Sequence, residues 1–312
     1  MVSFVAFSYA CPYVDDVLRN YKIVEVLGSG EYGTAFACVD ADSRHSTLAL
    51  KASNLETIFC ENCFKLERTV LQRISTLGTN EKSRFPTLVD NFVVDSTLGC
   101  LVMTKEGDSL GDVCKRNDPK KFSPTNVLKI MLSVGKSLQT IHSLGYIHRD
   151  IHWNNVLFAK TITPASPCKL IDYGVGKKFR NRRGNYVKNR PQRDVNFKEC
   201  GHVSWNVMMG GVPNLKDDFS SLMFLGLKIS GISSLEIGSV SEVRHQKMIF
   251  ELDPSRFLRS VPWLLKVACV IVDSDAEKFN YAGVFNAIKQ GFPFDEEEII
   301  NHSYLQGSLK VY

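Results

Sequence analysis

A polar loop at residues 148–155 separates two apolar segments, and this arrangement limits the possible folds more than any other stretch of the chain. The loop reads His-Arg-Asp-Ile-His-Trp-Asn-Asn, after an amphipathic helical pattern over 125–144 and before a short apolar strand at 156–158. It holds Asp150 and Asn155, five positions apart. A carboxylate in such a loop can accept a proton from a hydroxyl, and the amide can hold a metal ion that carries phosphate charge. The His-Arg-Asp triplet is weak alone, so its meaning depends on the motifs around it.

A glycine-rich segment, 28–33, lies between two strand-like stretches. It reads Gly-Ser-Gly-Glu-Tyr-Gly, after the alternating residues 21–27 and before the β-prone residues 34–39. A hairpin of this kind can lie over phosphates because its backbone N–H groups are not hindered by side chains. The same spacing between a strand and a helix would indicate a dinucleotide fold instead. The second strand favours the hairpin, and a glycine-rich turn without a ligand is the competing interpretation.

A lysine ends the third predicted strand, which covers residues 47–51. A lysine at the end of a buried strand costs free energy unless an anionic group lies beside it. Glu67 lies in the helical pattern over 61–75 and can reach Lys51, and Glu61 is a rival partner. Such a pair would place the Lys51 amine against nucleotide phosphates. Taken alone, Glu67 would be a solvated charge on a helix.

A second carboxylate follows a strand further along the chain. Residues 169–171 form an apolar strand pattern, and Asp172 comes next, two positions before Gly174. A carboxylate at a strand end beside a flexible glycine suits metal coordination. We expect Asn155 and Asp172 together to bind Mg²⁺ on nucleotide phosphates, whereas either residue alone would be an ordinary turn residue.

A short polar link at 104–107 divides a strand-rich part of the chain from a helix-rich part. Strand patterns at 85–94 and 99–103 precede the link, and helical patterns follow it at 125–144, 222–229, 255–272 and 281–290. The sequence therefore predicts an α+β chain with a small antiparallel-sheet lobe and a larger, mainly helical lobe. The expected organisation is an N-terminal arm (1–20), one domain (21–294) with lobes at 21–103 and 108–294, and a short peripheral tail (295–312).

The basic side chains are concentrated in one short run. The chain has 38 Lys and Arg against 33 Asp and Glu, and a net charge of +5. Eight basic residues fall within one stretch: Lys177, Lys178, Arg180, Arg182, Arg183, Lys188, Arg190 and Arg193. No basic surface interleaved with aromatic residues accompanies them, so we expect no nucleic-acid partner. A solvated charged segment is one interpretation of the run.

Cysteine usage favours a reducing compartment. The nine cysteines follow no framework spacing, and Cys60 and Cys63 form the only Cys-x-x-Cys pair, with no second pair to complete a zinc site. Residues 1–10 are apolar but lack a basic flank, and no stretch is long enough to span a bilayer. We therefore expect an intracellular protein of the cytoplasm or nucleus, without membrane association.

These motifs, in this order, resemble the eukaryotic protein kinase superfamily over residues 21–291. Within it the chain most resembles the casein kinase I group, which includes tau-tubulin and vaccinia-related kinases. Residues 174–180, Gly-Val-Gly-Lys-Lys-Phe-Arg, resemble that group's Gly-Leu-Ala-Lys-Lys-Tyr-Arg. Residues 107–110, Gly-Asp-Ser-Leu, resemble its Gly-Pro-Ser-Leu, and 216–222, Lys-Asp-Asp-Phe-Ser-Ser-Leu, resemble its Arg-Asp-Asp-Leu-Glu-Ser-Leu.

The resemblance implies a bilobal protein kinase fold, ATP bound between the lobes, and phosphorylation of Ser or Thr in protein substrates by a monomer. It implies catalytic roles for Asp150, His152, Lys51 and Glu67, and Mg²⁺ on Asn155 and Asp172. The nucleotide-binding residues would be Gly28, Ser29, Gly30, Gly33, Lys51, Met103, Thr104 and Glu106. Asp218 would tie a central helix to the backbone of the catalytic loop. Lys177, Lys178 and Arg180 would receive an acidic or phosphorylated group of the substrate.

Three departures from the group's pattern leave alternatives open. His152 stands in place of a Lys that contacts the transferred phosphate, Trp153 in place of a Pro, and 201–205 reads Gly-His-Val-Ser-Trp in place of Gly-Thr-Ala-Arg-Tyr. Losing one charged contact would lower the rate by about 10²–10³, so we expect reduced activity.

The departures also allow two alternatives. One is an inactive kinase that acts as a binding or scaffold module. The other is a small-molecule phosphotransferase, since aminoglycoside-kinase-like enzymes carry a His two residues after the catalytic Asp; Arg149, the glycine segment and the basic run argue against it.

Overall fold

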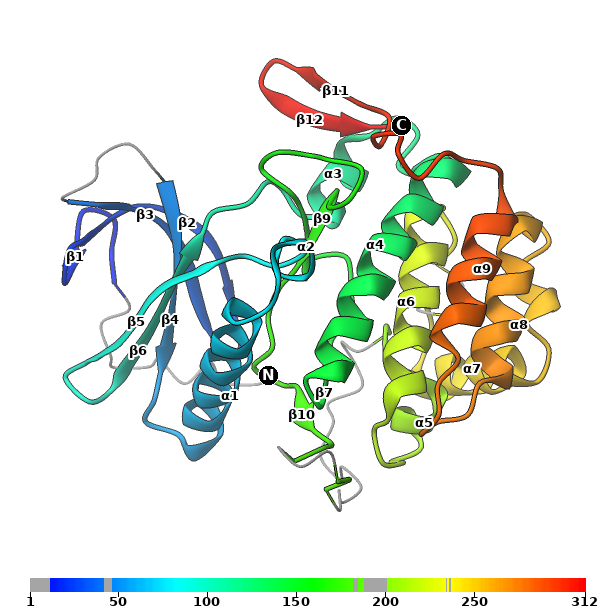
Figure 1. Cartoon of the computed structure of the whole chain (residues 1–312), viewed down its shortest axis with the longest axis horizontal. Helices are drawn as coiled ribbons and strands as arrows, with labels where there is room; N and C mark the ends of the chain where they lie inside the picture. Colours follow the sequence, from blue (N-terminus) through cyan, green and yellow to red (C-terminus); the bar gives the residue numbers. More distant parts are fainter. Residues whose placement is uncertain (1–11, 42–46, 182–184, 188–200, 234, 236) are drawn as a thin grey trace. The chain divides into compact units, whose positions relative to one another are not determined.

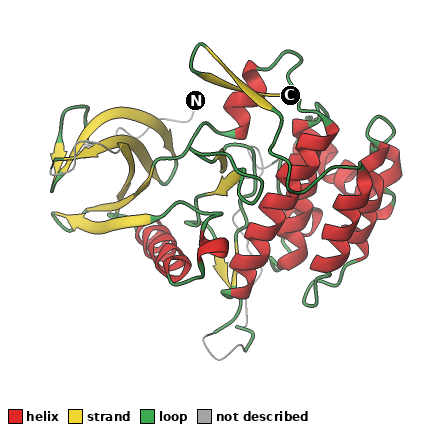
Figure 2. Cartoon of the chain, turned by 45° about the horizontal axis from the view of Figure 1, so that its top comes forward, coloured by secondary structure: helices red, strands yellow, loops and turns green. Residues whose placement is uncertain are grey.

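The computed structural model describes residues 12–41, 47–181, 185–187, 201–233, 235 and 237–312 (Figure 1). The chain divides into two compact units. Unit 1 comprises Met1–Ser75 and Pro86–Lys105, and unit 2 comprises Thr76–Phe85 and Glu106–Tyr312. Figure 2 shows the long strands of unit 1 in yellow and the helices of unit 2 in red.

Unit 1 is built on a six-stranded antiparallel sheet in the order β1-β2-β3-β4-β6-β5. The apolar residues of the central strands alternate toward one buried face, so Ile23, Leu50 and Val102 are fully buried. One long helix, α1, buries an apolar stripe that includes Phe64 and Val70. The bounds are β1 Val17–Leu18, β2 Tyr21–Gly30, β3 Gly33–Asp40, β4 Thr47–Asn54, α1 Ile58–Ser75, β5 Leu88–Val94 and β6 Leu98–Thr104.

The first strand of this sheet lies in the stretch that the sequence assigned to an N-terminal arm. Val17 pairs with Lys22 and Leu18 with Tyr21, so residues 17–18 extend the sheet by one short strand. Residues 1–11 of the expected arm lie outside the described residues.

Unit 2 is mainly helical, and its long helices pack on one another. Helix α4 contacts α6 and α9, and α8 contacts α6 and α9. Ser123 caps α4 by accepting a hydrogen bond from the backbone N–H of Asn126, with Pro124 in the first turn, as the sequence predicts. The helices are α2 Thr79–Lys82, α3 Leu110–Arg116, α4 Pro124–Ser143, α5 Trp205–Met208, α6 Leu215–Ile229, α7 Val240–Leu252, α8 Leu265–Asp273 and α9 Tyr281–Gly291.

The helix predicted over 255–272 is interrupted. Two 3-10 turns, η1 Pro254–Phe257 and η2 Pro262–Leu264, precede α8, which begins only at Leu265. Proline has no N–H to donate and its ring clashes with the preceding turn, so Pro262 begins a helical segment rather than continuing one. The apolar periodicity on both sides of it misled the sequence-based expectation.

Short two-stranded sheets hold the polar loops of unit 2. Strand β8 (Val156–Phe158) pairs with β9 (Cys168–Leu170), and β7 (Tyr146–Ile147) pairs with β10 (Lys177–Lys178), both antiparallel. Residues 148–155 therefore run from the end of β7 to the start of β8. The sheets fix both ends of this loop.

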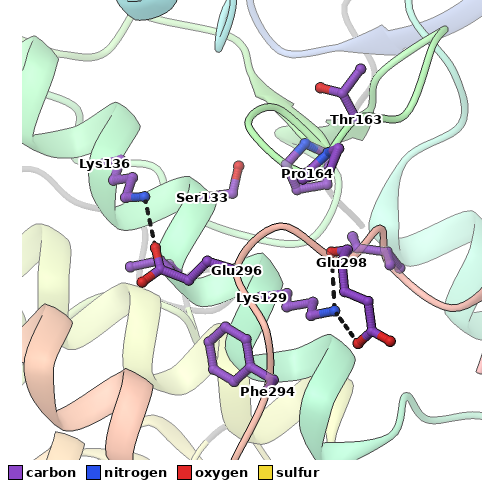
Figure 3. Close-up of a pocket in the computed structure, with 11 residues that line it drawn as sticks. Lys129, Ser133, Lys136, Thr163, Pro164, Phe294, Glu296 and Glu298 are labelled. Carbon is purple, nitrogen blue, oxygen red and sulfur yellow. Dashed lines mark hydrogen bonds and ion pairs between the residues drawn. The ribbon is translucent and has the colours of Figure 1, made fainter.

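The segment predicted to be a peripheral tail packs against α4. The α4 side chains Lys136 and Lys129 form ion pairs with Glu296 and Glu298, at 3.5 and 3.3 Å, around a small pocket into which Ser133 also faces (Figure 3). Lys129 is only 8% exposed, and it also donates to the Glu298 carbonyl at 3.0 Å. These contacts place the beginning of the tail on the surface of α4.

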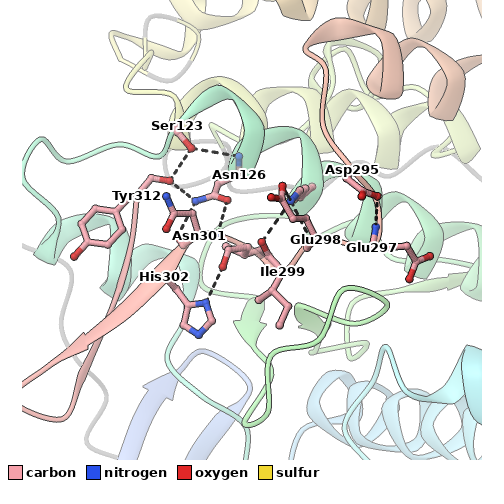
Figure 4. Close-up of polar contacts among 11 residues, drawn as sticks. Ser123, Asn126, Asp295, Glu297, Glu298, Ile299, Asn301, His302 and Tyr312 are labelled. Atoms are coloured by element: carbon pink, nitrogen blue, oxygen red, sulfur yellow. Dashed lines mark hydrogen bonds and ion pairs between the residues drawn. The ribbon is translucent and has the colours of Figure 1, made fainter.

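The remainder of the tail forms a hairpin of strands β11 (His302–Leu305) and β12 (Ser308–Val311). Asn126 of α4 is fully buried, and its amide donates to the Asn301 carbonyl and accepts from the Asn301 N–H, both at 3.0 Å (Figure 4). Ile300 and Val311 are buried as well. A buried amide requires hydrogen-bond partners, and here the tail backbone supplies them. The tail is thus part of the packed structure of unit 2.

Candidate active site

A buried aspartate anchors the start of the loop at 148–155. Asp218, in the first turn of α6, accepts hydrogen bonds from the backbone N–H groups of His148 and Arg149, each at 2.7 Å, and lies 2.9 Å from Nε2 of His142. Burial acts to raise the pKa of Asp218, but the contacts with His142 and His148 outweigh it and the pKa is lowered. Arg149 has a φ of 73°, a left-handed conformation that an arginine adopts only where surrounding contacts hold it.

His148 connects the loop to the segment that follows β9. Its Nδ1 accepts from the Asp150 N–H at 3.3 Å, and its Nε2 donates to the Ile171 carbonyl at 3.0 Å. Burial lowers the pKa of His148, so the ring is neutral and this tautomer satisfies both contacts. The loop and the Asp172 segment are therefore held together by one imidazole.

Asn155 holds Asp150 in place. Its Nδ2 group donates to the Asp150 carbonyl at 3.0 Å and to Asp150 Oδ2 at 2.9 Å. Both partners are acceptors, so the amide nitrogen must face Asp150. The amide oxygen, Oδ1, is left to serve as an acceptor or a metal ligand.

Two histidines contact the Asp150 carboxylate. Nε2 of His202 lies 2.8 Å from Oδ1, and Nε2 of His152 lies 3.5 Å from Oδ2. The two imidazole rings lie close together, with centroids 5.0 Å apart and planes tilted by 46°. Burial acts to raise the pKa of Asp150, but its interactions with His152 and His202 lower it far below its ordinary value. Asp150 is therefore held as a carboxylate.

Asp172 lies beside Asn155 at one end of the β8–β9 sheet. Val156 pairs with Leu170, and the Ile171 N–H donates to the Asn155 carbonyl at 3.0 Å. Asp172 has a φ of 64°, and its Oδ1 accepts from the Gly174 N–H at 3.3 Å. Arg149 and Asp172 are thus two residues in this region with a left-handed backbone, and the surrounding contacts must hold both of them.

The structure brings Lys51 and Glu67 of unit 1 together. Lys51 Nζ lies 2.7 Å from Glu67 Oε2, and their side chains are 15% and 5% exposed. Glu61, the rival partner, instead pairs with Lys65 at 2.6 Å. Because α1 turns its apolar stripe toward the sheet, Glu67 faces β4 with that stripe. The buried lysine thus has the anionic partner that it requires.

The glycine segment is a hairpin between β2 and β3. Gly33 has a φ of +146°, and a Cβ there would lie 2.4 Å from the Ala52 carbonyl oxygen, so the backbone itself requires glycine. Gly28 differs, because a Cβ at that position would meet nothing within 4 Å. Among the described residues, packing does not account for glycine at this position. Ser29 Oγ lies 3.0 Å from Thr34 Oγ1 across the hairpin, and Gly30 pairs with Gly33.

The predicted link residues have partners within their own units. Met103 pairs with Ala49 in the sheet, and Thr104 Oγ1 accepts from the Thr87 N–H at 3.0 Å. Glu106, in unit 2, accepts from the Lys160 N–H at 3.1 Å.

The basic run is only partly described. Lys177 and Lys178 form β10, and burial and the nearby Arg149 charge lower the pKa of Lys177. Arg180 donates to the Tyr186 hydroxyl at 3.0 Å and lies over its ring. The remaining members of the run, Arg182, Arg183, Lys188, Arg190 and Arg193, lie outside the described residues.

Sequence reasoning missed His202, Asp217 and Lys247 as contributors to this region. Asp217 accepts hydrogen bonds from Ser204 at 2.6 Å and Asn206 at 2.9 Å, and Lys247 donates to the Gly201 and Val203 carbonyls. The only signal in the sequence was that residues 201–205 depart from the group's pattern. Among the described residues, no group of three or more His, Cys, Asp or Glu side chains is arranged to hold a metal ion.

Comparisons with known proteins agree with this architecture. The protein kinase domain family matches residues 21–193. The structure of vaccinia related kinase 3 superposes with a TM-score of 0.75 at 19% identity, over 90% of this chain and 91% of that chain. The predicted fold class, with a small antiparallel-sheet lobe and a mainly helical lobe, is confirmed.

Three curated relatives match at lower coverage. A Caenorhabditis elegans protein named as a serine/threonine-protein kinase is 26% identical over 166 residues, 52% of this chain and 44% of the relative. The human dual specificity protein kinase CLK1 is 26% identical over 151 residues, 48% and 31% of the two chains. A C. elegans protein named as a casein kinase I is 23% identical over 167 residues, 54% and 47%. The match spans less than half the length of each of these relatives.

Within the described part of the chain, no helix is both long enough and apolar enough to cross a membrane.

Proposed function

The chain belongs to the protein kinase domain family, and on that premise we propose that it transfers the γ-phosphoryl group of ATP to Ser or Thr hydroxyls of protein substrates. The observation that carries this proposal is the carboxylate of Asp150, which is held by Asn155 and by His202. The predicted likeness to the casein kinase I group is confirmed, because a protein named as a casein kinase I and the structure of vaccinia related kinase 3 are among the matches. The choice of Ser or Thr acceptors is the finer part of the proposal.

Asp150 orients the acceptor hydroxyl and takes its proton as the hydroxyl oxygen bonds to the γ-phosphorus, while the bond from that phosphorus to the bridging oxygen breaks and ADP leaves. Its charged state supports this role, because a protonated carboxyl could not accept the proton. Asn155 fixes the carboxylate through Oδ2, and Asp218 fixes the backbone on which Asp150 is carried. The low pKa of Asp150 makes it a weak base, so orientation is its larger contribution.

In unit 1, Lys51 and the glycine hairpin would hold phosphates. Glu67 keeps the Lys51 amine at one position, 2.7 Å from its own carboxylate. The open surroundings of Gly28 leave its backbone accessible to a ligand. ATP supplies the phosphoryl group when bound, and Mg²⁺ offsets the charge of its phosphates.

Asn155 and Asp172 fit the predicted Mg²⁺ site by their donor atoms. Asn155 directs its amide nitrogen to Asp150, so its oxygen is the atom left for a hard cation. Asp172 supplies a carboxylate on the neighbouring segment. Carboxylate and amide oxygens are the ligands that Mg²⁺ prefers.

A catalytically weak or inactive protein that binds partners is the second candidate. The specific observation in its favour is that His202 already contacts the carboxylate on which transfer depends. A substrate hydroxyl would then need the other oxygen of Asp150, or a different position of the imidazole.

Phosphate transfer from labelled ATP with Mg²⁺ to an acidic protein such as casein separates the two candidates. Transfer well above an Asp150→Asn control supports the kinase, and His152→Lys should raise it because it adds a full charge. Transfer at the level of the control, together with thermal stabilisation by ATP and Mg²⁺, would leave only the binding function.

The substrate preference is a further part of the proposal. Lys177 and Lys178 lie on β10, and Lys177 lies near Arg149. We expect faster transfer to acidic or pre-phosphorylated peptides than to neutral peptides of the same length, and equal rates would remove the preference. Monomeric state, intracellular location and the lack of nucleic-acid partners stay predictions from the sequence.

A further inference from the structure

His202 is the side chain outside the loop at 148–155 that makes the closest described contact with the Asp150 carboxylate. Its Nε2 lies 2.8 Å from Oδ1, whereas His152 lies 3.5 Å from Oδ2, at the outer limit of a hydrogen bond. The His202 side chain is 12% exposed. Asn155 already occupies Oδ2 at 2.9 Å. The two oxygens of Asp150 are thus held from two sides, by Asn155 and by His202.

The backbone on both sides of His202 is fixed by a buried lysine. Lys247, in α7, is fully buried and donates to the carbonyl oxygens of Gly201 and Val203, the two neighbours of His202. Its amine also lies 4.4 Å from the centre of the Phe224 ring. An amine that donates to the carbonyls of both flanking residues leaves His202 little freedom.

Ser204, which follows Val203, is fixed as well. Ser204 donates to Asp217 Oδ1 at 2.6 Å, and it caps α5 by accepting from the Val207 N–H at 3.1 Å. Ser204 is 2% exposed and Asp217 is 7% exposed. These anchors come from α6 and α7, so the position of His202 is set by the helical core and not by the loop it contacts.

We infer that His202 is a positioning residue for phosphoryl transfer, which holds the Asp150 carboxylate in its reactive orientation through Oδ1. This inference rests on the proposed function. A carboxylate whose two oxygens are both held keeps one orientation, and orientation of this kind contributes to the rate of transfer rather than to nucleotide affinity. The segment 201–205, which departs from the group's pattern, would then carry a working contact of its own.

Three variants of the full chain test this inference. His202→Leu removes the donor and keeps an apolar side chain, and we expect kcat to fall about 10- to 100-fold, as for the loss of one hydrogen bond to a charged group, with the KM for ATP within about twofold. His202→Gln keeps an N–H donor, and we expect it to restore most of kcat. His245→Leu is the matched control, because His245 is exposed on α7, the helix that carries Lys247, and its kcat should equal that of the unmodified protein.

The imidazole ¹⁵N NMR signals of histidine-labelled protein give a readout that does not depend on activity. The signal absent from His202→Gln identifies His202, and we expect it to shift in Asp150→Ala while the signal of His245 stays in place. An unshifted His202 signal, or an unchanged kcat in His202→Leu, would overturn the inference. If the unmodified protein shows no transfer above Asp150→Asn, the proposed function fails; the shift then decides by itself whether His202 holds Asp150.

Discussion

Two adjacent buried aspartates at the start of α6, Asp217 and Asp218, hold two different regions, and their pKa values are shifted in opposite directions. Asp218 holds the loop at 148–155, and its pKa is lowered because contacts with His142 and His148 outweigh its burial. Asp217 holds the segment at 204–214, and burial raises its pKa to about 6, although Ser204, Asn214 and Asn206 donate to it. The two side chains have the same chemistry and similar depth, so their partners make the difference.

The comparison shows how one helix end supports both sides of Asp150. Asp218 is a carboxylate at neutral pH because its pKa is lowered, so its hydrogen bonds to the loop at 148–155 do not change there. The Asp217 side changes protonation close to the physiological range, and it supports the segment that carries His202. The 201–214 segment is therefore the one whose anchoring aspartate changes charge near neutral pH.

The largest effect should come from Asp218→Asn. The amide would direct an N–H₂ group toward donors that now bind a carboxylate, and breaking a buried charged contact costs about 3–5 kcal/mol. We expect a loss of that size in urea unfolding at pH 7, with transfer activity reduced to the level of Asp150→Asn. A larger loss of unfolding free energy in Asp217→Asn at the same pH would contradict this comparison of the two aspartates.

Asp217→Asn should have a smaller effect whose size depends on pH. The folded pKa of about 6 lies above the ordinary value of 3.8, so the folded state holds the proton more tightly. The stability from this group is complete below pH about 4 and is lost as pH rises through about 6, by about 3 kcal/mol in all.

We therefore expect the unfolding free energy of the unmodified protein, minus that of Asp217→Asn, to fall between pH 4 and pH 7 in urea titrations. Asp218 has the opposite sign, because its lowered pKa gives stability that is lost only as pH falls. A difference between the Asp217→Asn variant and the unmodified protein that does not vary over this range would contradict the raised pKa.

Ser204→Ala should weaken the contacts of Asp217 and leave those of Asp218 unchanged. It removes the 2.6 Å donor to Asp217 and the cap of α5, which together contribute about 1–2 kcal/mol. Because that donor lowers the pKa of Asp217, its loss should move the pH-dependent window above 6. Urea unfolding between pH 4 and pH 8 measures both effects, and a window that moves to lower pH would count against this account.

The smallest effect should come from Tyr281→Phe on the Asp218 side. The Tyr281 hydroxyl lies 2.8 Å from Nδ1 of His142, whose other nitrogen contacts Asp218. Losing one such hydrogen bond costs about 0.5–1.5 kcal/mol. We expect a slightly lower midpoint in thermal unfolding and unchanged transfer activity; a loss of activity would show that the His142 orientation reaches Asp150.

The local parts of the candidate site could be predicted because they depend on neighbouring residues. The strand before Lys51 and the periodicity of α1 placed Glu67 within reach, and the structure joins the two at 2.7 Å. Pro262 also indicates the break before α8, although the apolar periodicity continues on both sides of it. The tail could not be foreseen, because its contacts with Asn126 depend on a buried amide far away in the sequence.

The sequence by itself determined the elements of the fold and the chemistry of the loop at 148–155, since periodicity, glycine spacing and the separation of Asp150 from Asn155 are local properties. Only the tertiary structure revealed that His202 meets Asp150 there. His202 reaches Asp150 because α6 and α7 fix the backbone around it, whereas the contact of Asp218 with the loop was already implied by the family resemblance. Contacts between distant residues depend on how helices pack, and packing energy is shared among too many side chains for any one motif to reveal it.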